Sequence, residues 1–184
     1  ANGFVGSSVV RCLLEAGHEV CCLVRPKSNQ NNLKGLSVEI LEGDLRNTIS
    51  LKNAIRNCEN LFHVAADYRL WVPDPEIMYD INVKGTKELI LAAFESGVSR
   101  IVYTSSVATL GLNLDGNPAN ENTPSSFENM IGHYKQSKFL AEQQVLHLTN
   151  KYQLPLVIVN PSTPIGPRDI RPTPTGRIVL DTLC

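Results

Sequence analysis

Short runs of apolar residues alternate along the chain with longer segments in which apolar residues recur every three or four positions. The apolar runs predict β-strands at residues 18–24, 37–44, 60–66, 100–106 and 154–161. The periodic segments predict helices at residues 4–16, 50–57, 74–96, 133–152 and from 175 onward. Because the strands are almost continuously apolar and helices separate them, the pattern predicts an α/β fold with a parallel sheet covered on both faces.

Several predicted helix boundaries carry typical signals. Gly17 ends the first helix, Asp74 followed by Pro75 opens the third, and Ser50 is in a position to cap the second. In parallel sheets of this kind, ligands bind at the carboxyl ends of the strands. Functional residues are therefore expected directly after the predicted strands.

The chain opens with "ANGFVGSSVV", in which Gly3 and Gly6 precede and enter the first predicted helix. Two glycines at this spacing let backbone N–H groups approach a pyrophosphate, while a helix that begins near Phe4 or Val5 points its positive end at it. The alternative is a tight turn with close helix packing and no ligand. Two glycines alone leave both interpretations open.

Arg25 lies at the carboxyl end of the second predicted element, 19 residues after Gly6. Dinucleotide-binding folds place at this point the residue that meets the adenosine ribose. An arginine suits the 2′-phosphate of NADP, and Lys27 and Ser28 add charge and hydrogen-bonding capacity nearby. The alternative is a solvated charge before Pro26.

Tyr134 and Lys138 are four residues apart and so project from one face of the predicted helix 133–152. A phenol has a pKa of about 10, too high for a base at neutral pH. One ammonium about 4 Å away, at an effective dielectric constant of about 20, offsets about 4 kcal/mol, or about 3 pKa units. Lys138 is therefore predicted to lower the pKa of Tyr134; the alternative is two surface residues of an amphipathic helix.

A hydroxyl group is expected to polarise the reacting oxygen beside this pair. The predicted strand that precedes the helix ends in "YTSSVATLG". Ser106 is the candidate, with Ser105 and Thr109 as alternatives.

The amino-acid composition and the net charge disfavour several classes of binding partner. The 184 residues are 42% hydrophobic and 19% charged with a net charge of −1, which fits one globular domain and offers no basic patch for nucleic acid. No apolar run approaches the length of a transmembrane helix, and no signal peptide is evident. The five cysteines are odd in number and lack metal-ligand spacing, so they are expected to be reduced and mostly buried in a cytoplasmic protein without a metal site.

Seven motifs, in order and spacing, resemble the extended short-chain dehydrogenase/reductase family over essentially the whole chain. They are "NGFVG", "GDL", "HVAA", "NVKGT", "YTSSVAT", "YKQSKFLAE" and "NPSTPIGP". Within this family, "HVAADYRLWVPDP" and "NPSTPIGPRDIRPTPTGR" are most similar to hopanoid-associated sugar epimerases, with dihydroflavonol reductases and 3β-hydroxysteroid dehydrogenases as near relatives. The resemblance implies a Rossmann-type, doubly wound parallel sheet that binds NAD(P). It also implies an oxidoreductase or epimerase that transfers a hydride at a carbinol or ketone carbon of a nucleotide-sugar or hopanoid-pathway substrate. The alternative is an NADPH reductase similar to dihydroflavonol 4-reductases or 3β-hydroxysteroid dehydrogenases.

The resemblance also implies roles residue by residue. Ser106 bonds the substrate oxygen, Tyr134 is the acid/base and Lys138 also grips the nicotinamide ribose. The segment from Gly3 to Gly6 lies at the pyrophosphate, and the segment from Pro161 to Thr163 borders the nicotinamide. The implied cofactor-binding residues are Gly3, Phe4, Val5, Gly6, Arg25, Asp44, Leu45, Ala65, Ala66, Tyr134, Lys138, Pro161, Ser162 and Thr163.

Other positions have structural interpretations. Asn82 resembles a family position that supports the fold, and His63 is expected to be a buried histidine bonded to backbone. Tyr68, Arg69 and Trp71 follow the third predicted strand, where they either touch substrate or form a surface loop. The two long helices resemble the pair that forms a dimer interface in this family, which predicts a homodimer.

Two departures from the family pattern affect the predicted reaction. Val107 and Ala108 follow Ser106 where the 4,6-dehydratases carry an acidic pair, which disfavours dehydration. Arg25 replaces the acidic residue of NAD-using epimerases, which favours a reductase with exchangeable NADPH, although NAD stays possible. A cofactor-binding sensor or scaffold is the alternative of another class, and the Ser106, Tyr134 and Lys138 set argues against it.

The glycine turn at the start of the chain lacks the strand that precedes such turns in the family. Residues 1–184 are therefore expected to be an NAD(P)-binding Rossmann domain truncated at both ends, without its first strand and without a C-terminal substrate domain. Such a first strand is central to the sheet, so its loss exposes backbone hydrogen-bonding groups.

Overall fold

The computed structural model describes residues 1–113 and 115–183, which form two compact units. One unit comprises Ala1–Asp44 and Thr163–Cys184, and the other comprises Leu45–Ser162. Each unit contains parallel strands and helices, so the predicted α/β class is confirmed. The five predicted strands form a two-stranded sheet in the first unit and a three-stranded sheet in the second.

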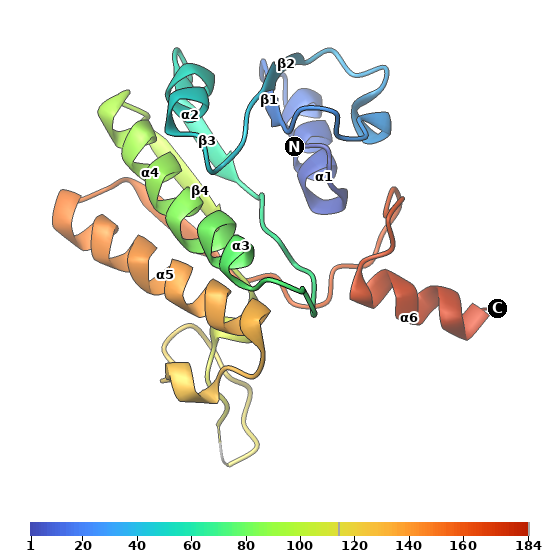
Figure 1. Cartoon of the computed structure of the whole chain (residues 1–184), viewed down its shortest axis with the longest axis vertical. Coiled ribbons are helices and arrows are strands. Elements are labelled where there is room, and N and C mark those ends of the chain that lie inside the picture. The colour runs from blue at the N-terminus through green and yellow to red at the C-terminus, as the bar shows by residue number, and fades with distance from the viewer. Residues whose placement is uncertain (114, 184) are drawn as a thin grey trace. The chain divides into compact units, whose positions relative to one another are not determined.

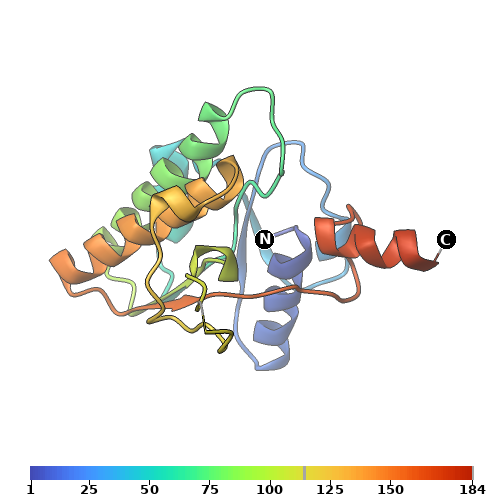
Figure 2. The same ribbon diagram turned by 90° about the horizontal axis from the view of Figure 1, so that it is seen from below.

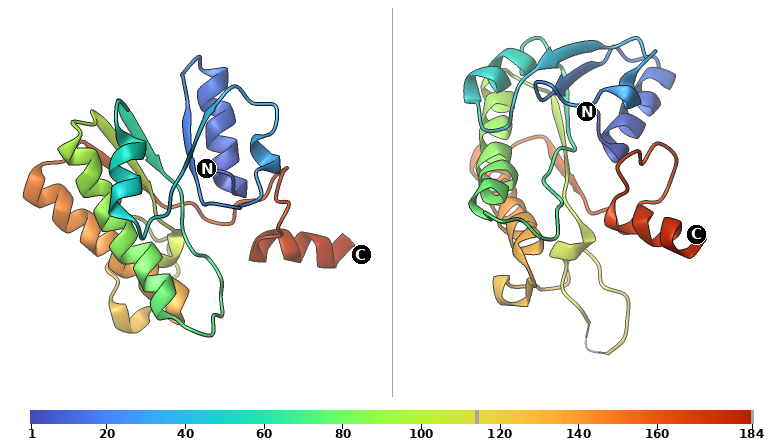
Figure 3. Two further views of the ribbon diagram at one scale, coloured as in Figure 1. Left: turned by 45° about the horizontal axis from the view of Figure 1, so that its top comes forward. Right: turned by 45° about the vertical axis from the view of Figure 1, so that its right-hand side comes forward.

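The first unit is built on α1 and a pair of short strands. Its elements are α1 (Phe4–Glu15), β1 (Cys21–Val24), η1 (Asn31–Leu33), β2 (Glu39–Glu42) and α6 (Pro174–Leu183). Strands β1 and β2 are parallel, with Cys22 opposite Ile40. Helix α1 lies beside β1 in both views of Figure 3, because Val10 packs into a small core with Cys22 and Val24.

The second unit carries the longer helices. Its elements are α2 (Thr48–Ile55), β3 (Asn60–His63), α3 (Glu76–Tyr79), η2 (Asp80–Gly85), α4 (Thr86–Glu95), β4 (Arg100–Thr104), η3 (Val107–Thr109), η4 (Phe127–Asn129), α5 (His133–Tyr152) and β5 (Leu156–Val159). The strand order is β3, β4, β5, all parallel, and Tyr103 lies opposite His63 on one side and Ile158 on the other. Helices α4 and α5 run side by side (Figures 1 and 2).

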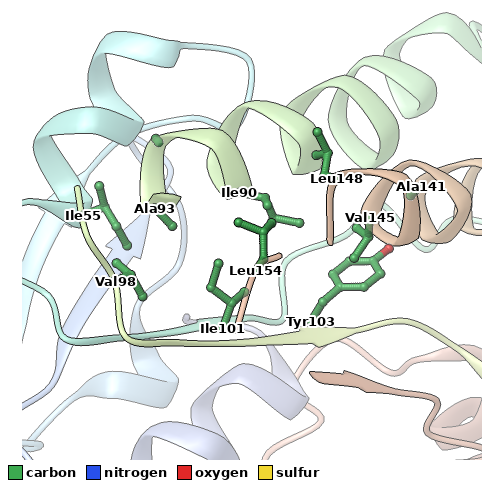
Figure 4. Close-up of a cluster of buried hydrophobic side chains, with 11 residues drawn as sticks. Ile55, Ile90, Ala93, Val98, Ile101, Tyr103, Ala141, Val145, Leu148 and Leu154 are labelled. Atoms are coloured by element: carbon green, nitrogen blue, oxygen red, sulfur yellow. The ribbon is translucent and has the colours of Figure 1, made fainter. Parts of the chain in front are cut away.

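The core of the second unit lies between the sheet and one layer of helices. Ile101 and Tyr103 alternate along β4 with more exposed residues and point toward the helices. Ile90 of α4 and Val145 of α5 meet them, and both are fully buried (Figure 4). This alternation anchors α4 and α5 against β4.

The predicted helix 74–96 is interrupted by a π-helical segment, η2. Asn82 lies within η2 and is buried, and Gly85 ends it. A Cβ atom on Gly85 would come within 2.7 Å of the Leu45 Cβ atom, so only glycine permits this close approach. The apolar residues keep a helical period on both sides of the π-helical segment, so apolar periodicity did not predict the interruption.

Other boundaries also differ from the prediction. Asn47, and not Ser50, caps α2: the Asn47 Oδ1 atom accepts from the Ser50 N–H at 3.1 Å. Among the described cysteines, only Cys22 is buried, Cys21 and Cys58 are half-buried and Cys12 is exposed, so the prediction of mostly buried cysteines is wrong; Cys184 lies outside the described residues. Within the described ranges, no helix is long and apolar enough to cross a bilayer.

Ile90 provides a test of this core. Replacing Ile90 with alanine removes a fully buried side chain between α4 and the sheet, so the free energy of unfolding should fall by about 2–5 kcal/mol. Urea denaturation of the purified protein measures the change. Ile49→Ala is the matched control, because Ile49 is 74% exposed, and it should change stability by less than about 0.5 kcal/mol. Equal losses in the two variants would contradict this account of the core.

Candidate active site

Ser106 lies directly after β4, where the chain leaves the sheet. The Ser105 N–H continues the β4 ladder by donating to the Val159 carbonyl at 2.8 Å. Ser106 then caps η3, and its Oγ atom accepts from the Ala108 N–H at 3.1 Å. Ser105 is buried, whereas Ser106 is only half-buried. Of the two serines, Ser106 is therefore the one that remains open to a ligand.

Tyr134 lies in the first turn of α5, which starts at a glycine with positive φ. Gly132 precedes the helix at φ 83°, a conformation that favours glycine. The Ser106 side chain lies close enough to the Tyr134 phenol to act on its pKa, so the structure brings these two predicted residues together. Burial raises the pKa of Tyr134, and the neighbouring Ser106 side chain opposes that rise.

Lys138 is buried one helical turn beyond Tyr134. Its Nζ atom donates to the Tyr103 Oη atom at 3.0 Å and to the Thr104 carbonyl at 3.0 Å, and it lies 4.7 Å from the centroid of the Tyr103 ring. Burial lowers the pKa of Lys138 to about 8, and the Glu142 carboxylate acts in the opposite direction. The group is therefore mostly protonated at neutral pH.

The predicted effect of Lys138 on Tyr134 needs correction. The sequence predicted that the ammonium would lower the phenol pKa by about 3 units. In the structure, the pKa of Tyr134 is raised instead, by burial, and the hydrogen bonds of the ammonium go to Tyr103 and Thr104. Four-residue spacing puts two side chains on one helix face, but it does not decide where a long lysine side chain ends.

Asn82 connects the end of β3 to α5. Its Oδ1 atom accepts from the Asp67 N–H at 2.7 Å, and its Nδ2 atom donates to the Asp67 carbonyl at 2.8 Å and to the Ser137 Oγ atom at 2.9 Å. The backbone beyond Ala65 and Ala66 is thus tied to the helix that carries Tyr134. This agrees with a supporting position for Asn82, which is buried within the π-helical segment.

His63 is fully buried at the end of β3. Its Nε2 atom lies 2.8 Å from the Thr86 Oγ1 atom, so its partner is a side chain and not the backbone, as the sequence had predicted. Burial lowers the pKa of His63 to about 3, and the charge of Lys138 adds to the effect. The imidazole is neutral at physiological pH, which suits a structural role.

Thr109, the alternative to Ser106, is occupied elsewhere. It is buried, and its Oγ1 atom lies 2.7 Å from the Ser106 carbonyl oxygen and 2.9 Å from the Glu142 Oε2 atom. The Asn160 Nδ2 atom donates to the same carboxylate oxygen at 2.9 Å. Sequence reasoning did not include Glu142 and Asn160, although Glu142 follows Tyr134 and Lys138 at the same four-residue spacing.

The glycine turn lies in the first unit and fits a phosphate group. Helix α1 begins at Phe4 with Gly3 as its N-cap, and no side chain caps its first-turn N–H groups. A Cβ atom on Gly3 would meet nothing within 4 Å, whereas one on Gly6 would lie 2.9 Å from the Ala1 carbonyl oxygen. The space beside Gly3 is open, and Gly6 packs closely against the Ala1 backbone. This arrangement lets an anion reach the N-terminus of α1.

The remaining predicted cofactor residues lie in both units. In the first, Arg25 is exposed directly after β1, its carbonyl accepts from the Ser28 Oγ atom at 2.6 Å, and Lys27 adopts a positive φ of 58°. The other residues of the first unit are Asp44, half-buried, and Thr163, exposed. The residues of the second unit are Leu45, buried; Ala66 and Pro161, half-buried; and Ala65 and Ser162, exposed.

The loop after β3 holds the three residues predicted to touch substrate or solvent. Trp71 is 77% exposed and Tyr68 is 43% exposed. Arg69 is exposed but is not free, because its guanidinium forms a two-pronged ion pair with the Asp67 carboxylate. The aromatic side chains are therefore available for a ligand, and the Arg69 charge is already compensated.

Comparisons with known proteins identify a family and several relatives of this chain. Residues 1–183 match the model of the family described as "NAD dependent epimerase/dehydratase family". The chain is 50% identical over 179 residues to a Synechocystis sp. protein named "Putative dihydroflavonol 4-reductase", covering 97% of this chain and 52% of that protein. It is 38% identical over 181 residues to sterol demethylase protein B of Methylococcus capsulatus, covering 98% and 55%.

One solved structure is especially similar. It is described as "Crystal structure of gox2253" and superimposes with a TM-score of 0.94 at 57% identity, covering 98% of this chain and 55% of that chain. The chain thus spans about half the length of the curated relatives it matches.

Lys138 gives a prediction about stability and pH. Its pKa of about 8 in the folded protein lies below the unfolded value of about 10.4, so the unfolded state binds more protons between these values and the native state gains stability as pH rises. Between pH 7 and pH 10, the wild-type protein should gain about 2 kcal/mol of unfolding free energy relative to Lys138→Met. Urea denaturation of both proteins across this range measures the difference, and parallel pH curves would contradict the burial of a charged Lys138.

Proposed function

We propose that this chain, which belongs to the NAD-dependent epimerase/dehydratase family, forms the dinucleotide-binding part of an NAD(P)-dependent oxidoreductase that reduces a ketone to a carbinol. The observation that carries the proposal is the closeness of the Ser106 side chain to the Tyr134 phenol, one helical turn from the buried Lys138 ammonium. A hydroxyl group, a phenol and a cation together match the needs of a carbonyl oxygen that gains a proton.

Each of these residues has a definite task in the proposed reaction. Bound NADPH supplies the hydride that adds to the carbonyl carbon. Tyr134 donates its phenolic proton to the carbonyl oxygen, and Ser106 holds that oxygen with a hydrogen bond. Because the pKa of Tyr134 is raised, the phenol is protonated at neutral pH, as a proton donor must be. Lys138 would hold the nicotinamide ribose of the bound cofactor.

The direction of the reaction distinguishes reduction from epimerisation. Epimerisation begins with oxidation, in which Tyr134 must first accept a proton from a carbinol. Net reduction needs a cofactor that exchanges after each turnover, so an exposed Arg25 that favours NADPH supports net reduction. For the substrate we propose a dihydroflavonol or a 3-ketosteroid, each of which contains a ketone, with a nucleotide sugar or a hopanoid-pathway compound as the alternative if epimerisation occurs.

The proposed cofactor is NADP, with NAD as the alternative. The glycine turn at Gly3 and the uncapped start of α1 support a pyrophosphate site. Arg25 supports the 2′-phosphate, because its guanidinium is exposed while its carbonyl is held by Ser28. A cofactor-binding sensor would need these groups but not the paired hydroxyls of Ser106 and Tyr134.

A homodimer through α4 and α5 is also part of the proposal. Apolar side chains remain on the outer surfaces of these helices: Phe94 is 44% exposed, Leu146 is 40% exposed and Leu140 is 36% exposed. Phe94 also stacks on Tyr152 of α5, with ring centroids 5.0 Å apart, so the two helices present one apolar surface. A second copy of the same surface would cover it.

The cofactor preference can be tested at Arg25. Arg25→Asp removes the cation and introduces a carboxylate, so NADPH should bind about 10–100-fold more weakly while NADH binding is retained. Fluorescence titration of the full-length protein with each nucleotide measures both constants. Arg56→Asp, a change of another exposed arginine, is the control. Tighter wild-type binding of NADH than of NADPH would contradict the proposed role of Arg25.

The proton donor can be tested at Tyr134. Tyr134→Phe removes the phenolic proton but keeps the ring, so turnover of a dihydroflavonol with NADPH should fall by about 10²–10⁴-fold while NADPH affinity is unchanged. Tyr152→Phe makes the same change at the other end of α5 and should leave turnover intact. Normal turnover by Tyr134→Phe would remove this residue from the proposed chemistry.

A further inference from the structure

Three polar side chains that the proposed reaction does not use surround the loop that carries Ser106. They are Thr109 in η3, Glu142 in α5 and Asn160 directly after β5, and we call them the Glu142 cluster. The Glu142 Oε2 atom lies 2.9 Å from the Thr109 Oγ1 atom and 2.9 Å from the Asn160 Nδ2 atom. One carboxylate oxygen thus connects three elements that meet at the carboxyl edge of the sheet.

The Glu142 cluster holds the main chain of Ser106. The Ser106 carbonyl oxygen lies 2.7 Å from the Thr109 Oγ1 atom and 3.1 Å from the Asn160 Nδ2 atom. A separate contact, from the Asn160 Nδ2 atom to the Thr109 Oγ1 atom at 3.1 Å, closes the cluster. The position of the Ser106 hydroxyl relative to Tyr134 therefore depends on groups that do not touch it.

Glu142 also faces the buried lysine. It lies one turn beyond Lys138 on α5, and its charge opposes the burial that lowers the pKa of Lys138. The same charge adds to the burial that raises the pKa of Tyr103. Among the described residues, the other titratable groups around Lys138 are Tyr103 of β4, His63 of β3, which is neutral, and Tyr134 of α5.

We propose that Glu142 is a positioning residue, which holds Ser106 in register with Tyr134 through Thr109 and Asn160 and places a negative charge on the helix face that carries Lys138. This inference rests on the proposed function, because Ser106 and Lys138 matter in this way only if they serve the reaction. It assigns the carboxylate two separable effects. One effect depends on its hydrogen bonds, and the other depends on its charge.

Two substitutions separate these effects. Glu142→Gln keeps an oxygen that can accept from Thr109 and Asn160 but removes the charge. Its kcat near pH 6.5 should stay within about threefold of the wild-type value, and the alkaline limb of its pH profile should move down by about 0.5–1 unit. Glu142→Ala removes both effects, so its kcat should fall about 10–100-fold at every pH, with the KM for NADPH within about twofold.

Turnover of a dihydroflavonol with NADPH by the full-length protein provides these values. Gln143→Ala, a change of the exposed neighbour on α5, is the control and should match the wild-type protein. A kcat in Glu142→Ala equal to that of the wild type would overturn the proposal. So would a pH profile of Glu142→Gln that coincides with the wild-type profile.

An NMR titration separates this proposal from the proposed function. The 13Cε resonance of Lys138, assigned by its loss in Lys138→Arg, reports the lysine pKa without turnover. The pKa should be lower in Glu142→Gln than in the wild type, even if no ketone is reduced. Absence of wild-type turnover with NADPH and a dihydroflavonol would count against the proposed reaction, whereas an unchanged Lys138 pKa would overturn the role of Glu142. If Glu142→Ala does not fold, Thr109→Val replaces it, with the same expected fall in kcat.

Discussion

The buried ammonium of Lys138 is the group on which the rest of the site depends. Removing such a charge from water costs several kcal/mol unless polar partners compensate it. Here the Tyr103 phenol, the Thr104 carbonyl and the face of the Tyr103 ring provide that compensation. All three come from the end of β4, so burying the charge requires α5 to lie against that end. This placement is also what brings Tyr134 to Ser106.

The sequence predicted the helices and strands well, but it predicted poorly the helix cap, the π-helical segment and the side-chain hydrogen bonds between elements. The bounds of α5, the five strands and the approach of Ser106 to Tyr134 follow from apolar periodicity and from the position of hydroxyl residues after a strand. The capping of α2 by Asn47, the π-helical segment and the hydrogen bonds of Asn82 did not follow. The hydrogen bonds of Asn82 depend on side chains that meet across elements, and one-dimensional spacing contains no information on them. The Asn47 cap is local, and asparagine is a favoured N-cap residue, so the sequence did contain that signal.

The pKa of Tyr134 shows that sequence spacing is also a poor guide to the electrostatic energy between two side chains. The predicted decrease assumed an ammonium about 4 Å from the phenol, and at that separation the Coulomb energy is large enough. The helix does place Lys138 one turn from Tyr134, but the flexible lysine side chain ends at Tyr103 and Thr104. Desolvation then dominates, and it acts on the two groups in opposite senses: it favours a neutral phenol and a neutral amine. A protonated phenol suits a proton donor better than a base.

The polar groups of the second unit form two supports along one stretch of α5. Asn82 fastens the backbone after β3 to Ser137, and Glu142 fastens the loop after β4 to Asn160. Ser137 and Lys138 are adjacent in α5, so both supports act on the stretch of helix that carries the proposed chemistry. A helix held only by its apolar face could slide along the sheet, because dispersion contacts are not directional. Hydrogen bonds from two strand ends remove that freedom, which explains why polar residues occupy buried positions where apolar ones would pack equally well.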